Sequence, residues 1–152
     1  MTATPIRILL WAPTASSRSL IAAGLAAALR AQVVDGDELA RRVAHDRGLW
    51  LRALGYALSD SAAVVVATAP LARTERDALA AAVAGLWWVE LVDVEPVRAP
   101  RRRRGHVDSD VAQPMQPLAA DESGVRVADD AGLDDVVARV ADLYRRGHQS
   151  LR

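Results

Sequence analysis

Short apolar runs alternate along this 152-residue chain with stretches whose composition favours helices. Apolar, β-branched runs such as "SAAVVVATAP" at 61–70 are typical of buried strands. Alanine- and leucine-rich stretches such as "RSLIAAGLAAALR" at 18–30 are typical of helices. The pattern predicts strands at 6–11, 31–34, 61–70, 86–94 and 125–129, and helices at 18–30, 38–58, 73–85 and 133–147. We expect the helix at 38–58 to be broken near Gly48.

This alternation predicts an α/β fold in which a parallel sheet is covered by helices on both faces. The length of the chain favours a single domain over residues 1–152. A segment rich in proline, arginine and aspartate at 95–124 interrupts the pattern, and it is long for a plain connection. Trp87 and Trp88 are adjacent in one predicted strand, so we expect one indole on each side of the sheet.

Composition and charge exclude several classes of protein. The formal net charge is zero, so nothing global attracts the chain to nucleic acid or to an anionic membrane. There is no cysteine, which excludes disulfides, thiol catalysis and cysteine metal sites. No uncharged apolar run reaches the ~18 residues that a membrane span needs, and the first residues lack the features of a signal peptide. We therefore expect a cytoplasmic protein that binds neither nucleic acid nor membrane.

Residues 9–30, "LLWAPTASSRSLIAAGLAAALR", have the strand, loop and helix layout of a phosphate-binding loop. Against the pattern G-x-x-x-x-G-K-[ST], only Ser19 matches strictly, and Arg18 stands in the place of the lysine. The free N–H groups at the helix start still favour an anion. The residues predicted to bind it are Thr14, Ser16, Ser17, Arg18 and Ser19. The alternative is that Ser16 or Ser17 caps the helix and that Arg18 is solvated.

Two further charged features are candidates for chemistry. Asp35 and Asp37 follow a predicted strand, where they could hold Mg²⁺ or orient a hydroxyl nucleophile. Alternatively, Asp37 caps the next helix and Asp35 faces water. The run from Arg101 to Arg104 could close over phosphates as part of a lid. A solvated charged surface and a nucleic-acid contact are the alternatives there.

Several motifs occur in one order along the chain: "DGDELARRV", "HDRGLWLRALG", "VVVATAPLARTERDAL", "RRGH" and "VRVADDAGLDDVVARVADLY". Together they resemble the gluconokinase family of small P-loop kinases, near the shikimate and adenylylsulfate kinases. The resemblance implies a three-layer α/β sandwich with a five-stranded parallel sheet and a lid at about 95–120. It also implies MgATP as the phosphate donor and gluconate as the acceptor.

The resemblance also implies roles for individual residues. Ser19 and Asp35 would lie at the metal, and Asp35, Asp37 and Arg18 would be catalytic. Arg101 and Arg104 would bind the cofactor from the lid. The acceptor would be bound by Asp46, Arg47, Arg73, Arg76 and His106. The stretch between "DGD" and "DR" is shorter than in the family, and the loop lacks both glycines and the lysine.

Three hypotheses follow for the function. The first is a phosphotransferase that acts on a small hydroxylated metabolite, with Arg18 in the role of the loop lysine. The second is a repurposed enzyme whose pocket holds an anionic small molecule without transferring phosphate from ATP. The third is a pseudokinase, an interaction or regulatory subunit whose site no longer does chemistry. A homodimer or a protein partner is open under all three hypotheses. The sequence leaves the acceptor and the oligomeric state open.

Overall fold

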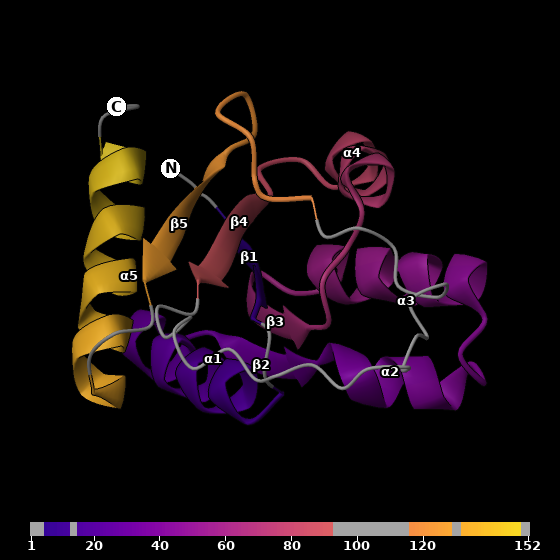
Figure 1. The fold of residues 1–152 in the computed structure, drawn as a ribbon, viewed down its shortest axis with the longest axis horizontal. Coiled ribbons are helices and arrows are strands. Elements are labelled where there is room, and N and C mark those ends of the chain that lie inside the picture. The colour runs from indigo at the N-terminus through magenta and orange to yellow at the C-terminus, as the bar shows by residue number, and fades with distance from the viewer. Residues whose placement is uncertain (1–4, 13–14, 93–115, 129–131, 150–152) are drawn as a thin grey trace, which may run out of the picture.

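A single parallel sheet with the strand order β2-β3-β1-β4-β5 organises the molecule (Figure 1). The computed structural model describes residues 5–12, 15–92, 116–128 and 132–149. The strands are β1 (Ile6–Trp11), β2 (Gln32–Asp35), β3 (Ala63–Thr68), β4 (Trp87–Val92) and β5 (Gly124–Ala128). Every strand pair in the sheet is parallel, which confirms the predicted α/β class.

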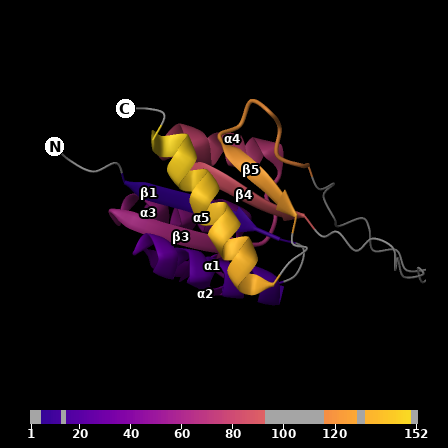
Figure 2. The same cartoon turned by 90° about the vertical axis from the view of Figure 1, so that its left-hand side faces the viewer.

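Helices cover both faces of the sheet and complete a three-layer sandwich. Helices α1 (Ala15–Leu29) and α5 (Leu133–Gln149) lie on one face and are nearest the viewer in Figure 2. Helices α2 (Gly36–Arg42), α3 (Arg47–Ser59) and α4 (Arg73–Ala82) lie on the other face. No helix in the described ranges combines the length and the apolar character that crossing a membrane requires.

The three central strands, β3, β1 and β4, contribute apolar side chains to two separate cores. Ile8 and Leu10 of β1 pack with α1 and α5, whereas Leu9 and Trp11 pack with α3 and α4. Trp87 and Trp88 lie in opposite cores, as their adjacency in one strand predicts. A parallel sheet needs apolar residues on both faces because helices cover both. This requirement explains the continuous apolar runs that identify the strands in the sequence.

The predicted break in the helix at 38–58 lies at residues 43–46 and not at Gly48, which is inside α3. Helix α2 ends in a turn where the Ala44 N–H donates to Arg41 O at 3.1 Å and the His45 N–H donates to Ala40 O at 2.8 Å. These two bonds define a Schellman cap, with Ala44 in the left-handed region at φ 54°. Glycine usually occupies that position, so the break has no glycine signal in the sequence.

Replacing Ala44 by glycine is expected to raise the free energy of unfolding by about 0.5–1 kcal/mol, because glycine adopts a positive φ without a Cβ clash. The converse control is Gly85→Ala. Gly85 has φ 75° and its Cβ would meet no atom within 4 Å, so the change isolates the backbone cost. That variant should be less stable by a similar amount. Urea denaturation of both variants measures the effect, and a destabilised Ala44→Gly protein would contradict the cap geometry.

Candidate functional site

The Arg18 side chain is turned back into the protein at the start of α1. Its Nη1 donates to the carbonyl of Ala12 at 3.0 Å, and its Nη2 donates to Asp37 Oδ2 at 2.6 Å. Only 8% of the side chain is exposed, compared with 33% for Asp37. The guanidinium therefore joins the end of β1 to the start of α2, and the solvated Arg18 considered as an alternative is not what the structure has.

The "DGD" sequence fixes the start of α2 against the sheet. Asp35 Oδ1 accepts from the Asp37 N–H at 2.9 Å and from the Glu38 N–H at 3.3 Å, so Asp35 is the N-cap. The alternative in which Asp37 caps this helix is therefore wrong, whereas its expectation that Asp35 is exposed to solvent is confirmed. A Cβ on Gly36 would lie 2.8 Å from the carbonyl oxygen of Ala67, which only glycine avoids. With Asp35 as the cap, the Asp37 carboxylate is left to pair with Arg18.

The start of α3 carries three residues that fix it against its neighbours, Asp46, Arg47 and Trp50. Asp46 caps α3 by accepting from the Leu49 N–H at 3.0 Å. Arg47 donates through Nη2 to Glu75 Oε1 at 2.7 Å, and its guanidinium carbon lies 4.4 Å from the centre of the Trp50 ring. The hydrogen bond from Arg47 lowers the pKa of Glu75. Both members of this pair are therefore charged at neutral pH.

A cavity of about 410 Å³ opens where these elements meet. It is lined by Arg18, Asp37, Ala40, Arg41, His45, Arg47, Trp50 and Ala69. Asp37 follows β2 and Ala69 follows β3, so the cavity lies at the carboxyl edge of the sheet, where open α/β sheets bind ligands. Among the described lining residues, three arginines and a histidine face one carboxylate. Each of the three arginines is paired with a carboxylate: Arg18 with Asp37, Arg41 with Glu38 and Arg47 with Glu75.

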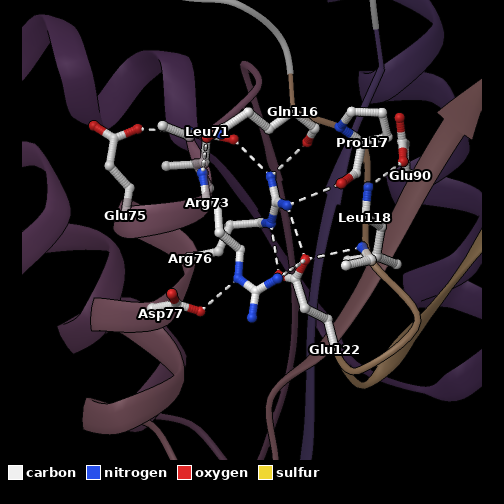
Figure 3. Close-up of polar contacts among 12 residues, drawn as sticks. Leu71, Arg73, Glu75, Arg76, Asp77, Glu90, Gln116, Pro117, Leu118 and Glu122 are labelled. Atoms are coloured by element: carbon white, nitrogen blue, oxygen red, sulfur yellow. Dashed lines mark hydrogen bonds and ion pairs between the residues drawn. The ribbon is translucent and has the colours of Figure 1, made fainter.

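Arg73 and Arg76 point to another part of the molecule (Figure 3). Arg73 donates to Asp77 at 2.8 Å and to Asp121 at 2.8 Å. Arg76 is 1% exposed and is bonded to the segment that precedes β5. Its five N–H donors reach Glu122 Oε1, Glu122 Oε2, Leu71 O, Gln116 O and Pro117 O. Neither arginine lines the cavity. Arg76 has no donor left for a substrate.

Comparisons with known proteins agree with this architecture. No protein-family model matches the chain, and a search of curated proteins finds no match. Among solved structures, a gluconokinase from Sinorhizobium meliloti is 26% identical with a TM-score of 0.76, and the match covers 99% of this chain and 97% of that chain. The chain is a structural relative of the gluconokinase-like small P-loop kinases.

Two further structures share this gluconokinase-like fold. One is a sugar kinase from Janibacter sp., 19% identical with a TM-score of 0.73, covering 93% of this chain and 95% of that chain. The other is shikimate kinase from Aquifex aeolicus, 16% identical with a TM-score of 0.65, covering 96% and 99%. At these identities the likeness extends to the fold alone. The fold is that of small-molecule kinases.

Several predicted site residues of this gluconokinase-like chain are not placed at the cavity. Ser19 is exposed on α1. Thr14, Arg101, Arg104 and His106 lie outside the described residues, as do the side chains of Ser16 and Ser17. In the described part of the chain there is no group of three or more histidine, cysteine or acidic residues that could hold a metal. The metal site at Ser19 and Asp35 stays a prediction.

Three cavity residues with charged or aromatic side chains were not predicted from the sequence. Arg41 lies four residues after Asp37 on α2, and this spacing places both on one side of the helix. Trp50 donates through its indole nitrogen to the carbonyl of Gly36 at 2.9 Å, which holds α3 against the start of α2. His45 reaches the wall through the turn between α2 and α3. The i, i+4 spacing from Asp37 could have indicated Arg41, and Trp50 is placed by its packing contact. No signal in the sequence indicates His45.

Proposed function

We propose that the cavity between α1, α2 and α3 binds an anionic small molecule and that Arg18 is its main anion-binding residue. The supporting observation is the nearly buried guanidinium of Arg18, which lies at the wall beside Arg41 and Arg47. Charge–charge attraction is stronger where water is excluded. The planar guanidinium also matches the geometry of a carboxylate or a phosphate.

On this scaffold we propose as the first candidate a phosphotransferase that acts on a small hydroxylated metabolite. Asp37 would accept the proton of the acceptor hydroxyl, because its carboxylate lies at the wall and is one-third exposed. Arg47 and Arg41 would bind the acidic group of the acceptor. The proposed architecture is one domain over residues 1–152 with a lid at 95–120, which lies largely outside the described residues.

The described residues fit MgATP less well than they fit a simple anion. Arg18 already donates to Ala12 and Asp37, and Asp35 is engaged as the cap of α2. Ser19 and Asp35 are the candidates to hold Mg²⁺, which would neutralise phosphate charge when bound. The second candidate function, anion binding without phosphate transfer, is favoured by the 2.6 Å bond between Arg18 and Asp37, because this bond engages the carboxylate that would accept the proton of an acceptor hydroxyl.

Calorimetric titration together with an assay of ADP release separates these functions. We expect sulfate and D-gluconate to bind the wild-type protein in either case. ADP release from MgATP that depends on an added sugar acid or cyclitol supports the kinase. Absence of MgATP binding at millimolar concentration, with anion binding retained, supports the second candidate. Failure of every anion to bind would contradict the proposed site.

The variant Asp37→Asn is expected to bind sulfate about fivefold more tightly than the wild-type protein. The substitution removes the carboxylate that repels an anion and that holds Arg18 Nη2 at 2.6 Å. In a kinase the same change should lower phosphate transfer, because Asn cannot accept the proton. Asp60→Asn, an exposed residue at the end of α3, has the same charge change and should leave the affinity unchanged. Weaker sulfate binding to Asp37→Asn would contradict the assignment.

A further inference from the structure

The turn between α2 and α3 contains two consecutive non-glycine residues with positive φ, Ala44 at 54° and His45 at 60°. The Schellman cap of α2 requires one left-handed residue, and Ala44 supplies it. The conformation of His45 is therefore additional to what the helix end needs. A left-handed L-residue costs roughly 1–2 kcal/mol, although histidine adopts this region more readily than most residues.

Contacts on both sides hold His45 in this conformation. Its N–H donates to the carbonyl of Ala40 at 2.8 Å, and the next residue, Asp46, donates its N–H to the carbonyl of Val43 at 3.1 Å. Asp46 then caps α3 through Oδ1. The turn therefore fixes the backbone of His45 at the cavity wall, where the side chain is exposed to solvent. Backbone strain of this kind is typically retained at functional sites.

We propose that His45 contacts the ligand of this cavity and that its protonation strengthens anion binding. This inference rests on the proposed anion site. A protonated imidazole carries a positive charge and two N–H donors, whereas the neutral ring has one donor. His45 is thereby a pH-dependent specificity residue, which favours dianionic over monoanionic ligands as the pH falls.

The other charged side chains around the cavity are arginines and carboxylates. They are Arg18 of α1, Asp37, Glu38 and Arg41 of α2, Asp46 before α3, Arg47 of α3 and Glu75 of α4. Arginine side chains stay charged, and an unperturbed carboxyl group has an ordinary pKa of about 4. Histidine is the side-chain type whose charge changes near neutral pH, and His45 is the histidine among the described residues that line the cavity.

The test is calorimetric titration with sulfate at about pH 5.5 and about pH 8. Sulfate keeps both charges over this range, so a change in affinity reports the protein and not the ligand. We expect wild-type protein to bind sulfate about tenfold more tightly at the lower pH, which corresponds to roughly 1.4 kcal/mol. D-Gluconate, with one charge, should show a smaller change.

The variant His45→Asn should lose this pH dependence and match the wild-type affinity at the higher pH. Asparagine adopts the left-handed region readily, so the turn should be kept. His45→Gly provides a second variant with the same backbone freedom. The matched control is His148→Asn on α5, where the ring stacks on Tyr144 at 3.9 Å and lies away from the cavity. This variant should keep the full pH dependence.

The outcomes distinguish the two proposals. Sulfate binding that does not change with pH in the wild-type protein would overturn the role of His45 and leave the anion site intact. A pH dependence that persists in both His45 variants would also overturn it, because another group would then be responsible. Absence of sulfate binding at either pH would overturn the anion site and this inference together.

Discussion

The free energy of unfolding of the variant Arg76→Met is expected to be roughly 3–5 kcal/mol lower than that of the wild-type protein, because the substitution breaks a buried ion pair. Arg76 is 1% exposed, and the Glu122 side chain that it pairs with is 6% exposed. Methionine keeps much of the volume and removes the charge. Glu122 would then be a buried carboxylate without its cation, and three carbonyl groups would lose their donor.

The large effect follows from what Arg76 connects. It joins α4 to residues 116–122, which lead into β5, and its guanidinium carbon lies 5.1 Å from the centre of the Trp11 ring. Glu122 Oε2 also accepts from the Ala119 N–H at 3.0 Å. Loss of one residue thus loosens a helix, a connection and the edge of the sheet at once. Figure 3 shows how Glu122, Leu71, Gln116 and Pro117 converge on Arg76.

Chemical denaturation at neutral pH measures this effect. The matched control is Arg52→Met on α3, where an exposed arginine is removed and a change within about 0.5 kcal/mol is expected. The double variant Arg76→Met/Glu122→Gln removes both charges and should recover part of the loss. An Arg76→Met protein as stable as the Arg52→Met control would show that the buried pair contributes little.

The buried pair of Arg76 and Glu122 also predicts that the free energy of unfolding depends on pH. Burial raises the pKa of Glu122, but hydrogen bonds from Arg76 and Ala119, with the charges of Arg76 and Arg73, outweigh it and leave the pKa below its ordinary value. A carboxyl group with a lowered pKa stabilises the fold at neutral pH, and that contribution is lost as the pH falls through the folded pKa. Stability measured on acidification should therefore fall less in Arg76→Met than in the wild-type protein.

The variant Arg18→Gln is expected to bind sulfate about a hundredfold more weakly, or roughly 2.7 kcal/mol. Two effects act in the same direction. The substitution removes a nearly buried positive charge from the cavity wall, and hydrogen bonds to charged groups contribute roughly 1.5–3 kcal/mol. It also leaves the Asp37 carboxylate without its partner, so that it repels an incoming anion.

Calorimetry of Arg18→Gln against Arg52→Gln provides the matched comparison, because the second variant loses the same charge from a surface outside this cavity. Circular dichroism should show both proteins folded. Arg18→Lys keeps a positive charge but loses the planar guanidinium. Its sulfate affinity should lie between those of the wild-type protein and Arg18→Gln. Equal sulfate affinity in Arg18→Gln and Arg52→Gln would contradict the central role of Arg18.

Most of the fold could be predicted from the sequence because the signals are local. An apolar run such as 61–70 identifies a strand that is buried on both faces, and β3 lies inside it at Ala63–Thr68. Helix α5 follows from its amphipathic spacing in the same way. The break after α2 was expected near Gly48 and lies a few residues earlier, because Ala44 fills a position where glycine is usual and its residue type did not reveal the left-handed turn.

The candidate site was only partly predictable, because its contacts join residues that are far apart in the sequence. The loop pattern and the family resemblance named Arg18, Asp37 and Arg47 as candidates, and all three line one cavity, while their roles stay predictions. It could not show that Arg18 bonds to Asp37 across 19 positions, or that Arg76 bonds to Glu122 across 46. Side-chain donors are allocated only after the strands have brought distant residues together. The sequence by itself determined the α/β framework and the arginine at the loop, whereas the tertiary structure decided which charges meet and which face the cavity.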